Sequence, residues 1–254
     1  MRSETPAPAR KLAFAMALAV TGLVAEPAWA GPDNLRESLF GQPPAAGRNA
    51  SPPVARYVSQ EGDVFVLDRS QNRPLLKFQD SPEVWALRPQ PAPRGDIIYK
   101  NDLGEPVLRA TRLGGLTLFT EDRPGGTAAA LAGGGPALRL PTLGPQQLLE
   151  RLAQASARAT RAARRLIPFE ADASPSSSAL VADAALVTSE AVIRMSKRPN
   201  GPAMIARFRK VSLVEGHKPG ASVQQGVMKI TITPNDGLAG RPSSDRIMAA
   251  AGGR

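Results

Sequence analysis

Two Gly-Asp pairs carry the carboxylates of this sequence that are best placed to do chemistry. Asp63 and Asp96 occur in the segments GDVFV and GDIIY, and each precedes a run of apolar residues. Two carboxylates from similar units can converge on one site, where one serves as an acid and the other as a base. Asp63 and Asp96 are therefore the candidate catalytic pair of a hydrolase acting on peptide or polysaccharide. The alternative is an ordinary turn, in which the Asp side chain binds local backbone N–H groups.

Most other catalytic chemistries lack the residues they need. The chain of 254 residues contains no Cys and a single His, His217. Without Cys there is no thiol nucleophile, zinc–thiolate site or iron–sulfur cluster. His217 lies in the turn-like segment EGHKPG, and no G-x-S-x-G motif supplies a serine for it to activate. We expect no metal site and no cofactor, and these residues favour a non-enzymatic role over an enzymatic one.

An arginine-rich helix is the best candidate for an anion-binding surface. Residues 145 to about 166 are strong helix formers, beginning with Pro145 and ending before Pro168. Guanidinium groups bind phosphate and carboxylate through paired hydrogen bonds, although a solvated helix face is the alternative. The apolar face consists of Leu148, Leu152, Ala155, Ala159, Ala162 and Leu166, and the anion-binding candidates are Arg151, Arg158, Arg161 and Arg165.

The first thirty residues predict export. Arg10 and Lys11 precede an apolar run over residues 12–25, and Ala28-Trp29-Ala30 matches a signal-peptidase site. This run is shorter than the roughly 20 residues of a spanning helix, so residues 1–30 read as a signal peptide. No later apolar run reaches that length either. We expect a periplasmic or secreted protein with no transmembrane segment after cleavage.

The positive charge is concentrated in the second half of the chain. The formal net charge is +10, yet residues 54–122 carry 9 basic and 10 acidic side chains, while residues 144–218 carry 12 and 6. In an exported protein this favours an anionic lipid, lipopolysaccharide or cell-wall polymer as the partner, or an envelope protein. Nucleic acid is a poorer match for that compartment.

Composition divides the rest of the chain into segments. Residues 31–53 form a flexible lead-in, and residues 123–144 a Pro/Gly/Ala linker or loop. Residues 54–122 contain about six short apolar strands separated by Gly, Pro, Asn and Asp, which predicts a β-meander. Residues 145–234 contain the helix and a further β-segment. These elements could share one hydrophobic core with the meander. Residues 235–254 read as a frayed tail.

The meander contains an internal repeat. GDVFV is followed twelve residues on by PLLK, and GDIIY is followed eleven residues on by PVLR. A half-buried unit of three strands cannot hide its apolar face alone, so two such β-hairpin units are expected to pack with pseudo-twofold symmetry. Chance similarity between strand–turn patterns is the alternative.

The segment after the helix predicts three antiparallel strands. Residues 185–195 and 203–214 are rich in β-branched residues, and Asn200-Gly201 between them is a hairpin signal. Residues 227–233 alternate apolar and polar side chains, as half-buried strands do. The fold class expected is α+β, mainly β: an antiparallel meander, one long amphipathic helix and this three-stranded antiparallel segment.

Three stretches resemble an exported family from alphaproteobacteria that is known as a domain of unknown function. They are YVSQEGDVFVLDRS, GDIIYKNDLGEPVLRATRLGGLTLF and LIPFEADASPSSSALVADAALVTSEAVIRMS, and the likeness covers roughly residues 54–248. The resemblance implies an exported, envelope-associated protein and supplies no catalytic residues. We therefore expect a non-enzymatic binding or structural module that contacts an anionic envelope component or a partner protein, with the carboxylate-based hydrolase as the alternative.

Overall fold

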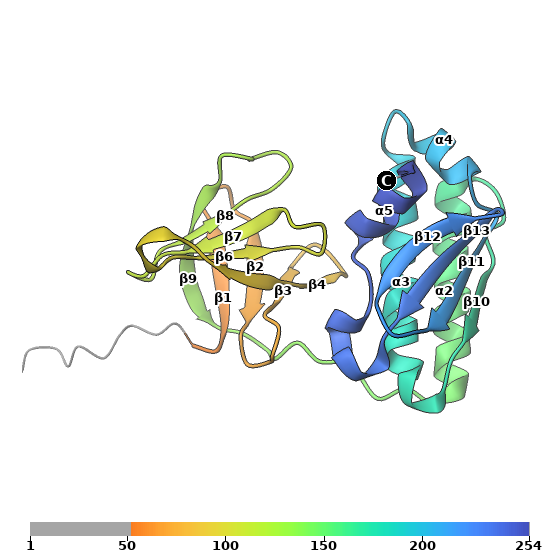
Figure 1. Ribbon diagram of the computed structural model, residues 1–254, viewed down its shortest axis with the longest axis horizontal. Coiled ribbons are helices and arrows are strands. Elements are labelled where there is room, and N and C mark those ends of the chain that lie inside the picture. Colours follow the sequence, from red (N-terminus) through yellow and green to blue (C-terminus); the bar gives the residue numbers. More distant parts are fainter. Residues whose placement is uncertain (1–51, 254) are drawn as a thin grey trace, which may run out of the picture. The chain divides into compact units, whose positions relative to one another are not determined.

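The computed structural model describes residues 52–253 (Figure 1), and residues 49–254 form one compact unit. The expected signal peptide, residues 1–30, lies outside the described residues, as does nearly all of the expected lead-in. The fold contains two β-sheets and several helices, which confirms the class α+β, mainly β.

The first sheet, sheet A, is antiparallel throughout and contains the expected meander. Its strand order is β4-β3-β2-β1-β9-β8-β7-β6-β5. The strands are β1 (Val54–Ser59), β2 (Val64–Asp68), β3 (Leu75–Phe78), β4 (Val84–Ala86), β5 (Arg88–Pro91), β6 (Ile97–Lys100), β7 (Pro106–Ala110), β8 (Leu116–Leu118) and β9 (Thr127–Gly134).

Sheet A closes on itself through one short segment. β4 pairs with β3 at one end of the strand order, and β5 pairs with β6 at the other. Only Leu87 separates β4 from β5, and it is fully buried. Closure leaves one enclosed apolar interior, which is filled by buried side chains including Phe65, Leu108 and Leu118.

The sequence repeat corresponds to two units of the same topology within sheet A. β2, β3 and β4 pair in series, and so do β6, β7 and β8. Gly62 and Gly95, which precede the two repeated aspartates, both have positive φ angles, of 94° and 80°. Glycine adopts this conformation without the steric cost that a side chain brings, so the two Gly-Asp pairs make similar entries into their strands.

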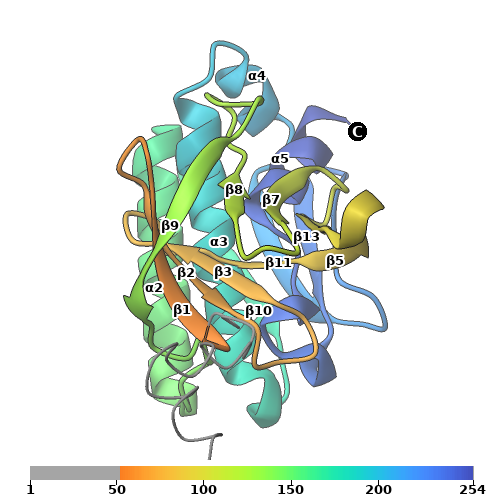
Figure 2. The same ribbon diagram turned by 90° about the vertical axis from the view of Figure 1, so that its left-hand side faces the viewer.

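The expected linker or loop over residues 123–144 is wrong in its first part, which contains strand β9. This strand pairs with β1 on one side and β8 on the other (Figure 2). Its sequence, TAAALAGG, has low intrinsic preference for strands. Pairing on both edges outweighs that low preference.

The second sheet, sheet B, is mixed rather than antiparallel. Its order is β10-β11-β13-β12, in which β10, β11 and β13 run parallel and only β12 is antiparallel to its neighbour. The expected three-stranded antiparallel segment is thus wrong in strand number and in direction. The strands are β10 (Phe169–Asp172), β11 (Lys210–Glu215), β12 (Gly220–Gln224) and β13 (Val227–Ile232).

Helix α2 (Pro145–Ala163) is the predicted arginine-rich helix, and it is three residues shorter than expected. Arg164 ends it in the left-handed conformation, with a φ angle of 54°. The chain then turns so that Ile167 is fully buried, while Leu166, expected on the apolar face, is 72% exposed. The hydroxyl of Thr160 accepts the Ile167 N–H at 3.0 Å and fixes this reversal.

Residues 185–195, expected to form a strand, belong instead to helix α3 (Ser178–Ser196). Nearly every face of α3 is buried, so its sequence lacks the amphipathic period that marks a surface helix. By length and composition the segment Pro175–Ser196 would also suffice to cross a membrane, contrary to our expectation of no such run. However, 67% of its most apolar stretch is buried inside the fold, as in the core helix of a soluble protein.

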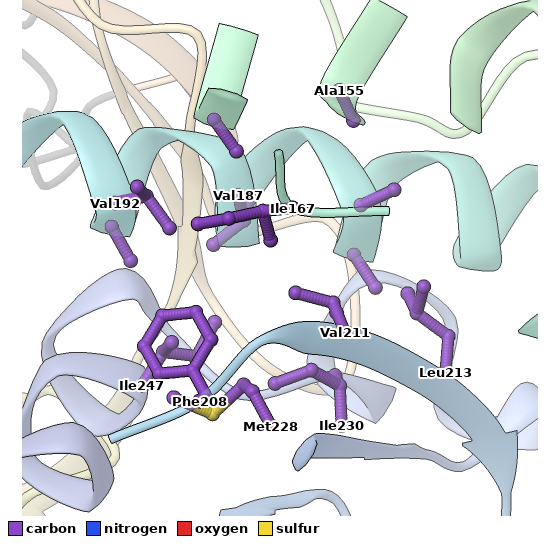
Figure 3. Close-up of a cluster of buried hydrophobic side chains, with 14 of the residues drawn as sticks. Ala155, Ile167, Val187, Val192, Phe208, Val211, Leu213, Met228, Ile230 and Ile247 are labelled. Carbon is purple, nitrogen blue, oxygen red and sulfur yellow. The ribbon is translucent and has the colours of Figure 1, made fainter. Parts of the chain in front are cut away.

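Helices α2 and α3 lie on one face of sheet B (Figure 1). Alternate residues of β11 and β13 are fully buried and belong to the core between the sheet and the helices. Figure 3 shows this core, in which Phe208 packs close to Met228 and Ile247. The labelled members are Ala155, Ile167, Val187, Val192, Phe208, Val211, Leu213, Met228, Ile230 and Ile247.

The expected frayed tail is a folded part of the core. The short helical segment η3 (Pro234–Gly240) leads into helix α5 (Ser244–Gly252). Ser243 caps α5 by accepting the Arg246 N–H at 3.1 Å. Ile247, Met248 and Ala251 are buried against the same core as α3.

Asn200-Gly201 is not a hairpin turn but the entry to helix α4 (Gly201–Ala206). A Cβ atom on Gly201 would lie 1.9 Å from the carbonyl oxygen of Met195. Glycine is therefore required here by the close approach of the end of α3.

We predict that Gly201→Ala lowers the free energy of unfolding by about 2 kcal/mol, since relieving the contact requires a backbone shift. Alanine's better helix propensity offsets only a part of this. Gly220→Ala is the matched control, because a Cβ there meets nothing within 4 Å, and it should change stability by less than about 0.5 kcal/mol. Urea unfolding of both variants checks the prediction, and equal stabilities would contradict it.

Candidate functional site

A buried guanidinium joins sheet A to the helical layer. The Arg241 side chain is 2% exposed and follows η3. Its Nε donates to the Asp183 carboxylate on α3, and its Nη2 donates to the Val84 carbonyl on β4 at 2.8 Å. One side chain thus holds three elements together, and we call this set of contacts the Arg241 junction.

The Glu83 carboxylate extends the junction to α5. It is 2% exposed, lies 3.8 Å from the Arg241 guanidinium, and accepts the Ser244 N–H at 2.9 Å and the Ser244 hydroxyl at 2.5 Å. Burial raises the pKa of Glu83, while the positive charge of Arg241 and the Ser244 hydrogen bonds oppose that rise without cancelling it.

Beside this junction lies a groove of about 440 Å³. We call it the groove. Its lining comes from β3 and β4, from the segment before α2, and from α2, α3 and η3. The apolar members are Pro82, Val84, Leu140, Pro141, Leu143, Ala155, Ala179, Ala182, Leu186 and Leu238, and the polar members are Lys77, Arg139, Arg151, Gln154, Arg158 and Asp183.

The charged lining of the groove leaves an excess of positive charge. Asp183 is the only carboxylate of the lining, and Arg241 already binds it. Arg158 is paired with Glu190 at 2.8 Å. Among residues 52–253, no ion pair engages Lys77, Arg139 or Arg151. The groove therefore combines apolar side chains with three cations that form no ion pair, although the charge of Arg139 also helps to lower the pKa of the nearby Asp68 carboxyl.

The extended segment that carries Arg139 is held in place by sheet A. The Leu138 N–H donates to the Asp68 carboxylate at 2.9 Å, and its carbonyl accepts from the Gln71 side chain at 2.7 Å. Burial raises the pKa of Asp68, but hydrogen bonds from Ser70 and Leu138 outweigh this effect and leave the pKa below its usual value. Asp68 stays ionised, and its bond to Leu138 positions the adjacent Arg139 and Leu140.

The structure divides the four predicted arginines. Arg151 and Arg158 line the groove. Arg161 is exposed on the last turn of α2 and is not among the groove residues. Arg165 lies beyond the helix, where it donates to the carbonyls of Ile205 and Phe208. Arg165 thereby satisfies carbonyl groups at and just beyond the end of α4, so the four predicted arginines do not form one anion-binding surface.

Asp63 and Asp96 have separate local partners. Asp63 accepts the Ser59 hydroxyl at 2.8 Å within the β1–β2 turn. Asp96 accepts Arg109 Nε at 2.8 Å and Nη2 at 2.5 Å, and these bonds hold its pKa below the usual value. The strands that follow them, β2 and β6, are not neighbours in sheet A. Asp63 has its partner within its own turn, whereas the partners of Asp96 are the Arg109 side chain on β7 and the Arg112 N–H, and no partner is common to both carboxylates.

Within residues 52–253, no group of three or more His, Asp or Glu side chains is arranged to hold a metal ion. His217 is exposed in the loop between β11 and β12. Sequence reasoning missed Lys77 and Arg139 as site residues, because each is a single basic residue in an otherwise ordinary strand or loop.

A family model for a domain of unknown function, DUF4908, matches residues 34–251. No curated protein and no solved structure matches the chain. The fold and the groove are therefore the basis for any assignment of function.

The raised pKa of Glu83 predicts how stability depends on pH. The folded protein binds this proton more tightly than the unfolded chain, whose carboxyl titrates near 4.5. The free energy of unfolding should therefore fall as pH rises from about 4.5 through the folded pKa of Glu83. Glu83→Gln should make this decline smaller, and the remainder is due to Asp245, whose pKa is also raised by burial. The exposed Glu150→Gln is the control, and urea unfolding between pH 4 and 8 measures both. The same pH slope in Glu83→Gln as in the unsubstituted protein would contradict the assignment.

Proposed function

The chain belongs to the DUF4908 family of domains of unknown function, and we propose that it is an exported, non-enzymatic binding module for an anionic lipid. The lipid's acyl chain covers the apolar floor of the groove, and its acidic head group meets Lys77, Arg139 and Arg151. The protein acts in the periplasm or as a secreted protein.

The observation that carries this proposal is the combination of two surfaces in one groove. Binding sites for small molecules are mostly apolar hollows of about 300–1,000 Å³ with a few placed polar groups, and the groove of about 440 Å³ falls in that range. An apolar floor alone would suit many ligands. The basic side chains in its lining, Lys77, Arg139 and Arg151, favour an anion.

The lipid fits this groove better than the other anionic partners expected for an exported protein. A hydrophilic wall polymer has no apolar part to cover the half-buried Leu143 and Leu186, so their exposed area would stay in contact with water. An acyl chain buries it, with a gain of about 25 cal/mol for each Å² removed from water. The head group then contributes roughly 1 kcal/mol for each nearby Lys or Arg.

A binding role is also favoured because the lining of the groove lacks the groups that catalysis requires. A nucleophile needs a base within hydrogen-bond reach. The single carboxylate of the groove, Asp183, is held by Arg241. The lining contains no His, Ser or Thr, and the two predicted catalytic aspartates, Asp63 and Asp96, are not part of it.

Vesicle binding tests the proposal. We expect co-sedimentation with phosphatidylglycerol vesicles and far weaker co-sedimentation with phosphatidylcholine vesicles. Replacing Lys77, Arg139 and Arg151 together by Ala should weaken the first at least tenfold, since each charge contributes roughly 1 kcal/mol. Leu143→Ser should weaken it without any change of charge. Arg161→Ala, on the same helix as Arg151 but outside the groove, is the control for the loss of one positive charge and is compared with Arg151→Ala alone.

Two results would overturn the proposal. One is equal binding of both vesicle types, which would remove the anionic selection. The other is a triple variant that binds phosphatidylglycerol vesicles as tightly as the unsubstituted protein does, or whose loss of affinity is no larger than that of Arg161→Ala. A weakened triple variant with unchanged Leu143→Ser would assign the groove to a hydrophilic anion instead of a lipid.

A further inference from the structure

A second hollow, of about 280 Å³, gathers basic side chains from separate parts of the chain. We call it the basic pocket. They come from the β2–β3 loop, from β5, from the β11–β12 loop and from the segment that enters α5. The charged and ionisable members are Arg73, Arg88, Asp102, His217, Lys218, Asp236, Arg241 and Arg246, and the others are Ala86, Pro219, Ala239 and Ser243.

The charges at one wall of the basic pocket are already neutralised. Arg241 is bound to Asp183 in the Arg241 junction. Arg246 donates to the carboxylate and the carbonyl oxygen of Asp102, with Nε 3.2 Å from the carboxylate. The same carboxylate accepts the Ser243 N–H at 3.0 Å and the Ser243 hydroxyl at 2.6 Å. These bonds make a rigid wall with little free hydrogen-bonding capacity.

The remaining cations of the basic pocket have no such partners. Among the residues that the structure describes, no ion pair engages Arg73, Arg88 or Lys218. Asp236 is the only other acidic residue of the lining, and it is exposed. Three cations from three different segments therefore face one hollow with a single carboxylate to balance them. This excess positive charge favours an anion that carries more than one negative charge.

The lining of the basic pocket favours a different class of ligand from the lipid proposed for the groove. Only Ala86, Pro219 and Ala239 are apolar here, so an acyl chain finds no floor. Guanidinium and ammonium donors around a small polar hollow suit phosphate, whose oxygens accept several charge-assisted hydrogen bonds at once.

A neighbouring hollow offers room for the organic part of a phosphate ester. It has a volume of about 450 Å³ and shares Arg73, Asp236 and Ala239 with the basic pocket. Its other lining includes the amide side chains of Asn72 and Asn235, and that of Gln71, whose Nε2 already donates to the Leu138 carbonyl. Amides both donate and accept hydrogen bonds, which is the chemistry that recognises hydroxyl groups. The pair of hollows thus matches a hydroxylated molecule with a terminal phosphate.

We propose that the basic pocket binds a soluble phosphate ester of a hydroxylated compound, such as a sugar phosphate. The phosphate lies between Arg73, Arg88 and Lys218, and the hydroxylated part occupies the amide-lined hollow. This site is distinct from the groove, because neither the basic pocket nor the amide-lined hollow shares a lining residue with the groove.

Isothermal titration of the purified protein with glucose 6-phosphate, inorganic phosphate and glucose, at constant ionic strength, tests the inference. We expect glucose 6-phosphate to bind more tightly than inorganic phosphate, and glucose not to bind. The double variant Arg88→Ala/Lys218→Ala should bind the ester at least tenfold more weakly, because it loses two charge-assisted hydrogen bonds. Both residues are exposed, so the variant should unfold at the same temperature as the unsubstituted protein.

Arg209→Ala is the control, because Arg209 is an exposed cation outside both hollows. Asn72→Ala tests the amide-lined hollow, and it should weaken binding of the ester but not of inorganic phosphate. Failure of the ester to bind, or equal binding by the double variant and the Arg209→Ala control, would overturn the inference. Equal affinity for ester and inorganic phosphate would overturn the placement of the hydroxylated part. Vesicle binding by the same double variant should be unchanged, which keeps this test separate from the groove.

Discussion

The buried guanidinium of Arg241 is the interaction on which the arrangement of this protein depends. A buried charge is costly unless it is paired and hydrogen-bonded, and here the partners come from different elements: Asp183 on α3 and the Val84 carbonyl on β4. Its burial is tolerated only when sheet A, α3 and the entry to α5 meet in one geometry. The apolar contact of Leu238 in η3 with Val84 accompanies it. We regard the charge as the source of the junction's specificity and the apolar contact as a source of its stability.

The groove and the basic pocket both border this junction, and their linings differ in chemistry. Asp183 and Val84 line the groove, while Arg241 itself lines the basic pocket. Since Asp183 and Arg241 neutralise each other, neither contributes a net charge to its own hollow. The cations that remain, such as Arg151 in the groove and Lys218 in the basic pocket, come from exposed positions. A stable centre surrounded by replaceable basic side chains is the arrangement expected of a binding module.

Sequence reasoning reached the fold class, the meander and α2 because their patterns are local. It missed α3 because a helix buried on nearly all sides has no amphipathic period. It missed β9 because Ala and Gly have low strand propensity, and this strand forms through its pairing with β1 and β8. Helix α5 had a readable signal: Ser243 as N-cap, Ile247 and Ala251 on one face, and Gly253 at its end. Of the site, Arg151 and Arg158 were predictable from one helix. Lys77 and Arg139 were not, since only the closed sheet brings them there.

The central claim is that the groove takes an acyl chain beside an acidic head group. Methyl NMR of the protein titrated with decyl phosphate, kept below its micelle concentration, tests it most directly. If the acyl chain lies in the groove, saturable shifts and intermolecular contacts appear at the methyl groups of Leu143, Leu186 and Leu238, which line it. Unchanged signals there, with shifts confined to exposed leucines such as Leu113 and Leu166, would contradict it.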